Sequence, residues 1–177
     1  MYSSIKKIAI IGSGVIGAGW VIRLLAKNKA VHVFEPNITQ QKFLLNEIKR
    51  TNQIVKKFFK ISKLNTTKLH FSDSLENAVK NADLIQENVP ENINIKKKVV
   101  KEISKWAKPK AIIASSSSGL LPSIIQNSCK KPNRFLIAHP FNPVYLLPLV
   151  ELVKGKKTSN NVLKLSQIFY KSIGMFP

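Results

Sequence analysis

A serine and a histidine 21 residues apart, Ser118 and His139, are the side chains of this sequence best placed to do chemistry. Ser118 closes the run Ser115–Ser118, His139 is followed by Pro-Phe-Asn-Pro, and each run comes after a short apolar stretch. In a doubly wound sheet, polar residues just past the strand ends gather in the crevice where a dinucleotide lies. A hydroxyl, a neutral imidazole and a hydride acceptor in one pocket would suit the oxidation of an alcohol near pH 7.

A glycine signature near the start of the chain supplies a candidate dinucleotide site. An apolar stretch, Ile8–Ile11, leads into G-x-G-x-x-G, and the residues of this turn that we expect to contact the cofactor are Gly12, Ser13, Gly14, Val15, Ile16 and Gly17. Glu35 follows a second apolar stretch, at the distance where a carboxylate binds the adenosine ribose and repels a 2′-phosphate. This context favours NAD over NADP. A packing turn beside a solvated acid is the alternative, and the combined context disfavours it.

Strand and helix patterns alternate along the whole chain, and they must position these residues. The expected strands are Ile8–Ile11, Val31–Phe34, Leu69–Phe71, Leu84–Gln86, Ile112–Ala114, Phe135–Ala138 and Leu149–Val153. The expected helices are Val15–Asn28, Phe43–Phe59, Leu75–Lys80 (capped by Ser72 or Asp73), Ile93–Trp106, Pro122–Gln126 and Asn160–Ile173. Such alternation predicts an α/β fold, a Rossmann-like doubly wound and mainly parallel sheet, in one domain spanning residues 1–177.

The composition narrows the possible classes of partner. The chain has 177 residues, 44% of them hydrophobic, and a formal net charge of +20. All but three of its 29 basic residues are Lys, and we interpret them as solvated faces because specific phosphate recognition tends to use Arg. No apolar run is long enough to span a membrane, there is no signal-peptide pattern, and Cys129 is the sole cysteine. We therefore expect a cytoplasmic protein without a metal, a nucleic-acid partner or a membrane partner.

Taken together, these residues resemble the N-terminal domain of the 3-hydroxyacyl-CoA dehydrogenase family over essentially the whole chain. The Gly12–Gly17 turn, Glu91 to Lys96, Ser115–Ser118, His139-x-x-Asn142-Pro143 and Glu151 follow the family's order and spacing. The stretches Gly17–Trp20 and His139–Glu151 are most similar to the L-carnitine 3-dehydrogenase branch. Ser115–Leu121 and Val89–Glu91 are also similar to the L-gulonate dehydrogenase branch.

The resemblance implies a role for each matching residue. His139 would be the general base, Glu151 its orienting carboxylate, and Ser118 and Asn142 would hydrogen-bond the substrate. Glu91 and Lys96 would contact the cofactor near the nicotinamide ribose. Structural alternatives stay open, since Ser115–Ser118 would also serve as a loop and helix cap and Lys96 to Lys98 as a solvated helix face.

The same resemblance implies NAD as cofactor and a small 3-hydroxy substrate. Pro140 stands where branches acting on CoA esters usually carry Phe, which favours L-carnitine over a 3-hydroxyacyl-CoA. Its trimethylammonium group would suit an aromatic face, for which Tyr145, Phe141 and Trp20 are candidates.

The resemblance implies a following helical domain that closes the cleft and forms a homodimer, and we expect residues 1–177 to be the N-terminal domain without it. We therefore expect these residues to bind NAD and to turn over substrate negligibly. An inactive NAD-binding remnant and a basic interaction protein are the alternatives.

Overall fold

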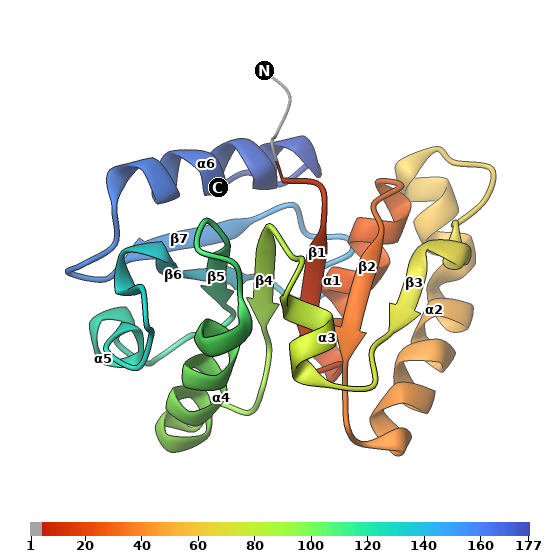
Figure 1. The fold of residues 1–177 in the computed structure, drawn as a ribbon. Coiled ribbons are helices and arrows are strands. Elements are labelled where there is room, and N and C mark those ends of the chain that lie inside the picture. Colours follow the sequence, from red (N-terminus) through yellow and green to blue (C-terminus); the bar gives the residue numbers. More distant parts are fainter. Residues whose placement is uncertain (1–4) are drawn as a thin grey trace.

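Seven strands form one sheet in a computed structural model that describes residues 5–177 (Figure 1). The strands are β1 (Ile8–Ile11), β2 (Val31–Phe34), β3 (Leu69–Phe71), β4 (Leu84–Glu87), β5 (Ile112–Ser115), β6 (Phe135–Pro140) and β7 (Val150–Lys154). Their order is β3-β2-β1-β4-β5-β6-β7, and only β7 runs antiparallel to its neighbour. This topology confirms the predicted doubly wound, mainly parallel sheet.

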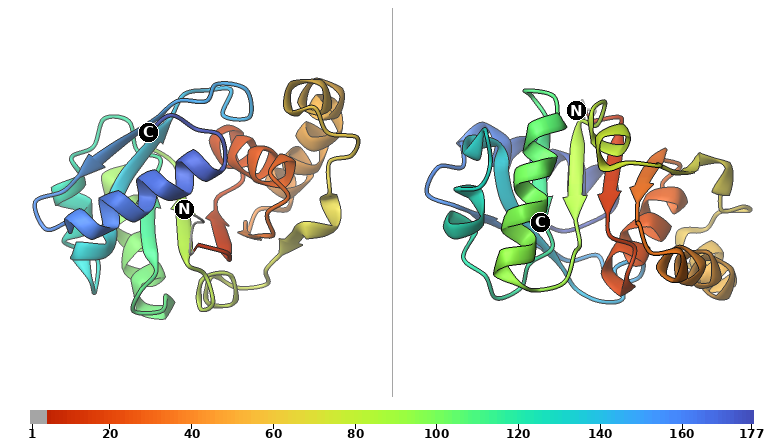
Figure 2. Two further views of the ribbon diagram at one scale, coloured as in Figure 1. Left: turned by 90° about the horizontal axis from the view of Figure 1, so that it is seen from above. Right: turned by 60° about the horizontal axis from the view of Figure 1, so that its bottom comes forward.

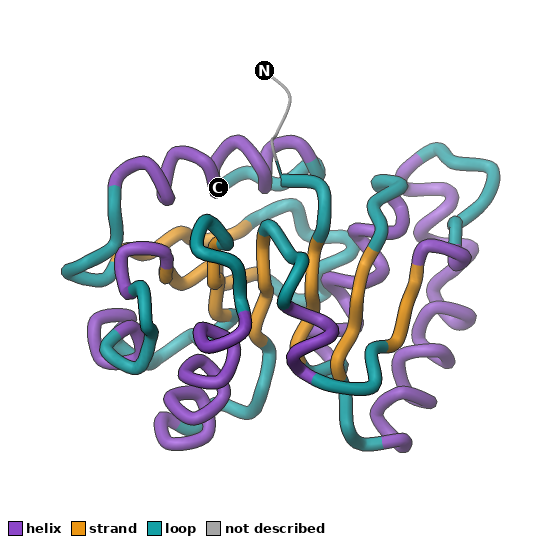
Figure 3. Tube along the Cα trace, viewed as in Figure 1, coloured by secondary structure: helices purple, strands orange, loops and turns teal. Residues whose placement is uncertain are grey.

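Helices cover both faces of the sheet, as the views in Figure 2 and the tube in Figure 3 make clear. They are α1 (Val15–Ala26), α2 (Ile38–Phe59), α3 (Leu75–Val79), α4 (Ile93–Trp106), α5 (Pro122–Gln126) and α6 (Asn160–Ser172). Two short 3-10 helices, Thr66–Lys68 and Pro132–Arg134, lie in the connections.

Two apolar cores result from the alternation of side chains along each strand. Ile8 and Ile10 of β1 face the core that packs against α1, α2 and α6. Ala9 and Ile11 face the core that packs against α3, α4 and α5. Because both faces of the parallel strands are covered, β1, β4 and β5 are buried along their whole lengths.

Helix α2 begins five residues before the predicted start at Phe43. Asn37 caps it by accepting a hydrogen bond from the Thr39 amide, and none of the residues in the first turn after the cap is buried. The prediction relied on the apolar spacing that begins at Phe43, so it missed a turn whose stability comes from the cap.

Smaller corrections concern the ends of other elements. Ser74 caps α3, in place of Ser72 or Asp73, by accepting from the Asn77 amide. Helix α1 ends at Ala26, two residues before the predicted end. Strand β6 runs on through Pro140, so His139 lies within the strand and is held by its pairing with β7.

Candidate functional site

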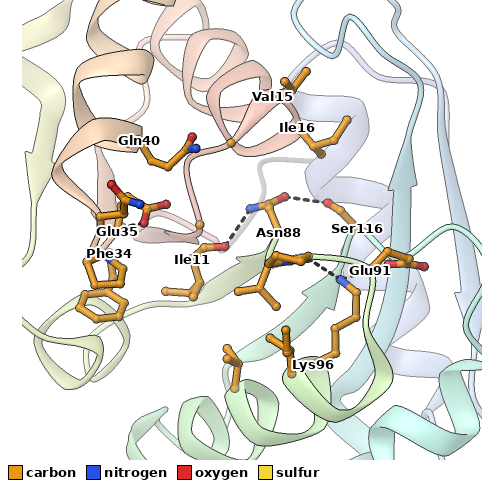
Figure 4. Close-up of a pocket in the computed structure, with 18 of the residues that line it drawn as sticks. Ile11, Val15, Ile16, Phe34, Glu35, Gln40, Asn88, Glu91, Lys96 and Ser116 are labelled. Atoms are coloured by element: carbon orange, nitrogen blue, oxygen red, sulfur yellow. Dashed lines mark hydrogen bonds and ion pairs between the residues drawn. The ribbon is translucent and has the colours of Figure 1, made fainter.

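A cleft of about 790 Å³ lies at the carboxyl ends of the parallel strands (Figure 4). Nine of the predicted site residues line it: Gly12, Gly14, Val15, Ile16, Glu35, Glu91, Lys96, Ser118 and His139. The other four predicted residues, Ser13, Gly17, Asn142 and Glu151, are outside this lining. The strand order places the crevice at the switch point between β1 and β4, where doubly wound folds bind their ligands.

The glycine turn between β1 and α1 has the geometry of an anion site. Gly12 adopts a φ of +86°, which side chains disfavour, and its carbonyl oxygen lies 2.0 Å from where a Cβ on Gly17 would stand. A Cβ on Gly14 would meet nothing within 4 Å, so the backbone there is open to a ligand. Gly14 also caps α1, whose first amide groups and dipole favour a phosphate.

Glu35 is fixed at the rim of the cleft by the glycine turn itself. Its Oε2 accepts from the Ser13 amide at 2.8 Å, and its Oε1 accepts from the Asn37 amide at 3.0 Å. A carboxylate has about four acceptor sites, so capacity remains for the hydroxyls of a ribose. Ser13 is fully buried, and its contribution lies in holding Glu35.

A buried ion pair that sequence reasoning missed lies beneath the cleft. The carboxylate of Glu87 is fully buried and accepts from Lys96 Nζ at 2.9 Å, from Ser115 Oγ at 2.5 Å and from the Val89 amide at 2.7 Å. Lys96 is only 1% exposed, which excludes the solvated helix face considered for it. A helical signal was present, because Lys96 shares the buried face of α4 with Val100 and Ile103.

Glu91 ties this pair to the loop that carries Ser118. Its Oε2 lies 3.4 Å from Lys96 Nζ, and its Oε1 accepts from Ser117 Oγ and from the amides of Ser118 and Gly119. Burial alone would raise the pKa of Glu91, but these hydrogen bonds and the nearby Lys96 outweigh it and hold that pKa below its usual value. Glu91 therefore holds the loop in place, and the exposed Ser118 faces the cleft.

His139 and Glu151 form a cross-strand pair. They are directly opposed in the β6–β7 register, and His139 Nδ1 lies 2.9 Å from Glu151 Oε2. With Nδ1 engaged by a carboxylate, Nε2 is the ring nitrogen left to face a ligand. The side chain of Glu151 is 57% exposed and lies behind the ring, outside the lining of the cleft. Strand pairing thus fixes the contact between His139 and Glu151 that the family resemblance implied.

Asn142 is a predicted catalytic residue that neither lines the cleft nor, unlike Glu151, contacts His139. It is exposed and precedes a cis peptide bond to Pro143. The loop after it is held by the buried Arg23 of α1, whose guanidinium donates to the carbonyls of Val144 and Leu147. The same guanidinium donates to two carbonyls at the end of α6, so one side chain joins three segments.

The three aromatic candidates for binding a trimethylammonium group differ in burial and in position. Trp20 is only 1% exposed and packs in the core at 5.5 Å from the ring of Tyr170, which removes it from the list. Tyr145 is half-buried against the same core. Phe141 is exposed, with its ring 5.6 Å from that of His139, although it is not among the residues that line the cleft.

Membrane-spanning helices and metal-ligand clusters are both absent from residues 5–177. Within this range no helix combines the length and apolarity that a membrane span requires. The same residues contain no cluster of three or more His, Cys, Asp or Glu side chains suited to a metal ion. His32 and His70 stack on each other at 5.1 Å on β2 and β3 and do not line the cleft.

Comparison with known proteins gives consistent matches. Residues 7–177 match the family model described as 3-hydroxyacyl-CoA dehydrogenase, NAD binding domain. L-carnitine dehydrogenase of Bacillus cereus is 44% identical over 99% of this chain and 54% of its own length, and that of Staphylococcus epidermidis is 44% identical over 96% and 53%. The chain thus spans about half the length of the curated relatives it matches.

A solved structure supports the same fold. The (S)-3-hydroxybutyryl-CoA dehydrogenase of Ralstonia eutropha superposes with a TM-score of 0.92 at 24% identity, covering 98% of this chain and 62% of that one. The glycine turn and the sheet topology agree with the family model, which matches residues 7–177. The chain belongs to the 3-hydroxyacyl-CoA dehydrogenase family, and its residues 7–177 match that family's NAD-binding domain.

Proposed function

We propose that residues 1–177 form the NAD-binding domain of a dehydrogenase that oxidises the 3-hydroxyl group of L-carnitine. The observation that carries the proposal is the His139–Glu151 pair, whose histidine lines the same cleft as the glycine turn and Glu35. A base oriented by a carboxylate and an NAD site in one crevice are what the oxidation of an alcohol requires.

The strand order suggests how NAD would lie in the cleft. Glu35 at the end of β2 would bind the adenosine ribose, and the start of α1 would bind the pyrophosphate. The nicotinamide half would then extend over the ends of β4 and β5, toward His139 on β6. The Glu87–Lys96 pair and Glu91 would support this half from below, so we assign Lys96 a supporting role beneath the nicotinamide ribose.

The chain's own residues would manage the proton of the reaction. Bound NAD would accept the hydride from the substrate carbon. His139 Nε2 would take the hydroxyl proton, and Glu151 would stabilise the resulting imidazolium through Nδ1. Ser118, held by Glu91, would hydrogen-bond the substrate oxygen. Asn142 would reach the substrate only by a rearrangement of its loop, because it lies outside the cleft lining.

L-carnitine is favoured because the relatives that match nearly the whole chain bear that name. Phe141 offers a ring beside His139 that suits a trimethylammonium group. A 3-hydroxyacyl-CoA and L-gulonate remain the competing substrates. A homodimer, implied by the family resemblance, and a cytoplasmic location, expected from the composition, complete the proposal.

The cofactor part of the proposal is tested by calorimetric titration of this chain with NAD and NADP. NAD should bind more tightly, and Glu35→Ala should narrow the difference because the ribose loses its carboxylate partner while the repulsion of a 2′-phosphate disappears. Glu102→Ala, an acid of α4 outside the cleft lining, is the matched control. Equal affinities in the unmodified chain would refute NAD selectivity, and binding of neither dinucleotide would refute the function.

The substrate part requires a longer protein. A chimera joining this chain to the remaining half of the Bacillus cereus relative should form NADH faster with L-carnitine than with 3-hydroxybutyryl-CoA or L-gulonate. A second chimera with the remaining, unmatched part of the Ralstonia eutropha enzyme shows which part sets the preference. Preference for the CoA ester in both chimeras would refute L-carnitine as the substrate.

A further inference from the structure

Five side chains form a polar network that crosses the core behind the cleft: Tyr170, Gln86, Ser116, Trp20 and Asn88, here called the core amide network. Tyr170 donates to Gln86 Oε1 at 2.5 Å, and Gln86 Nε2 donates to Ser116 Oγ at 2.9 Å. Ser116 Oγ donates to Asn88 Oδ1 at 2.8 Å and accepts from Trp20 Nε1 at 3.2 Å. Figure 4 shows its last link, with Asn88 between Ser116 and Ile11.

Each hydrogen bond in the network fixes the direction of the next. Burial raises the pKa of Tyr170, so its hydroxyl stays protonated and donates to the oxygen of the Gln86 amide. The nitrogen of that amide must then point at Ser116 and donate to its Oγ. Ser116 Oγ also accepts from Trp20 Nε1, so its own proton is directed to Asn88 Oδ1. Asn88 Nδ2 is left to donate to the carbonyls of Ile11 and Gln86.

The network ends at the part of the cleft where the nicotinamide half of NAD would lie. Asn88 and Ser116 both line the cleft, just past the ends of β4 and β5. Asn88 also abuts the glycine turn, since its carbonyl oxygen lies 3.0 Å from where a Cβ on Gly12 would stand. A second branch reaches the base, because Gln86 Nε2 donates to the carbonyl of Ala138, next to His139, at 3.3 Å.

Packing alone does not require this arrangement. Tyr170, Gln86 and Trp20 are each at most 1% exposed, and apolar side chains of similar volume would fill the same space without polar groups to satisfy. Fully satisfied buried networks instead specify a single orientation for each member. The group whose orientation this one determines is the Asn88 amide, at the floor of the cleft.

We propose that the core amide network is a positioning device that holds Asn88 and Ser116 for the nicotinamide ring of NAD, with Tyr170 of α6 as its anchor. The proposal rests on the NAD binding proposed above. It makes Tyr170, which lies outside the cleft lining, a positioning residue for the cofactor. The adenosine half, bound through Glu35 and the start of α1, is independent of it.

The test compares NAD with ADP-ribose, which lacks only the nicotinamide ring, by calorimetric titration of this chain. Tyr170→Phe keeps the ring packed against Trp20 and removes the first donor. We expect NAD binding to weaken about three- to tenfold, the range for losing one well-placed hydrogen bond, and ADP-ribose binding to change less than about twofold. Ser166→Ala is the matched control, because it removes another buried α6 hydroxyl, one without a hydrogen-bond partner among residues 5–177.

Ser116→Ala provides a second variant that removes the central acceptor. It should weaken NAD binding at least as much as Tyr170→Phe. The double variant should lose no more affinity than Ser116→Ala alone, since Tyr170 acts on the cleft through Gln86 and then Ser116. Equal losses for NAD and ADP-ribose, or unchanged NAD affinity in both variants, would overturn the inference while leaving the proposed function intact. If the unmodified chain bound neither ligand, the proposed function and this inference would fail together.

Discussion

Gly17 and Gly14 lie three residues apart in the same turn. Replacing each in turn with alanine should separate an effect on the stability of the fold from an effect on cofactor binding. A Cβ on Gly17 would stand 2.0 Å from the carbonyl oxygen of Gly12, against an ordinary contact distance of at least 3.4 Å. The obstacle is a backbone atom, which cannot rotate away as a flexible side chain would. Helix α1 must therefore move away from β1 by more than about 1 Å, an overpacking strain of a kind that cores tolerate poorly.

The stability lost in Gly17→Ala depends on how firmly α1 is held in the fold. Ten of its twelve residues are buried, and Arg23 ties it to the loop after β6 and to the end of α6. Overpacking a well-packed core costs about 1–3 kcal/mol, and the rigid obstacle places Gly17→Ala near the upper end. For a domain of this size, about 3 kcal/mol lowers the thermal midpoint by about 6–12 °C. NAD affinity should fall as well, because the amides that would bind the pyrophosphate move with the helix.

Gly14→Ala is the matched comparison, measured in the same two assays of thermal unfolding and NAD titration. Its Cβ meets nothing within 4 Å and its φ of −60° suits any residue, so the midpoint should change by less than about 2 °C. NAD binding should still weaken, because the new methyl group lies where the pyrophosphate approaches the backbone. Full stability in Gly17→Ala, or unchanged NAD affinity in Gly14→Ala, would refute this account of the turn.

Two further predictions concern the base and the loop. In the chimera with the Bacillus cereus half, His139→Gln should lower the turnover of L-carnitine by about 100-fold or more while NAD affinity stays the same; near-normal turnover would remove His139 as the base. Because the pKa of Glu91 is lowered in the folded state, its contribution to stability is present above its ordinary value of 4.5 and is lost as the pH falls below it. In urea titrations, Glu91→Gln should therefore be less stable than the unmodified chain near neutral pH and match it well below pH 4.5, and a gap that persisted in acid would contradict this.

The sequence was most informative where a local pattern determines the geometry. The glycine turn, Glu35 and the two strands carrying His139 and Glu151 were all predictable, because turns and apolar runs leave strong signals over a few residues. The antiparallel register that opposes His139 and Glu151 fixes their contact more firmly than their spacing alone could indicate.

What the sequence left undetermined depends on tertiary partners. Lys96 looks like its neighbours Lys97 and Lys98, and only the packing of α4 on the sheet turns it inward to Glu87. Gln86 stands in a buried strand, so a hydrogen-bond partner was to be expected, but Tyr170 lies 84 residues away and no local rule connects them. Asn142 matches the family pattern, yet its loop geometry holds it outside the cleft.

Because β1 lies inside the sheet, between β2 and β4, its two neighbouring strands are synthesised at different times during translation. β1 pairs with β2 on one side, but its other neighbour, β4, is synthesised about 75 residues later, so a nascent chain ending before Leu84 exposes that edge of an apolar strand. Unpaired edges of this kind invite aggregation. We therefore expect the half-sheet β1-β2-β3 to depend on chaperones during translation, until Leu84–Glu87 emerges and pairs with the free edge of β1.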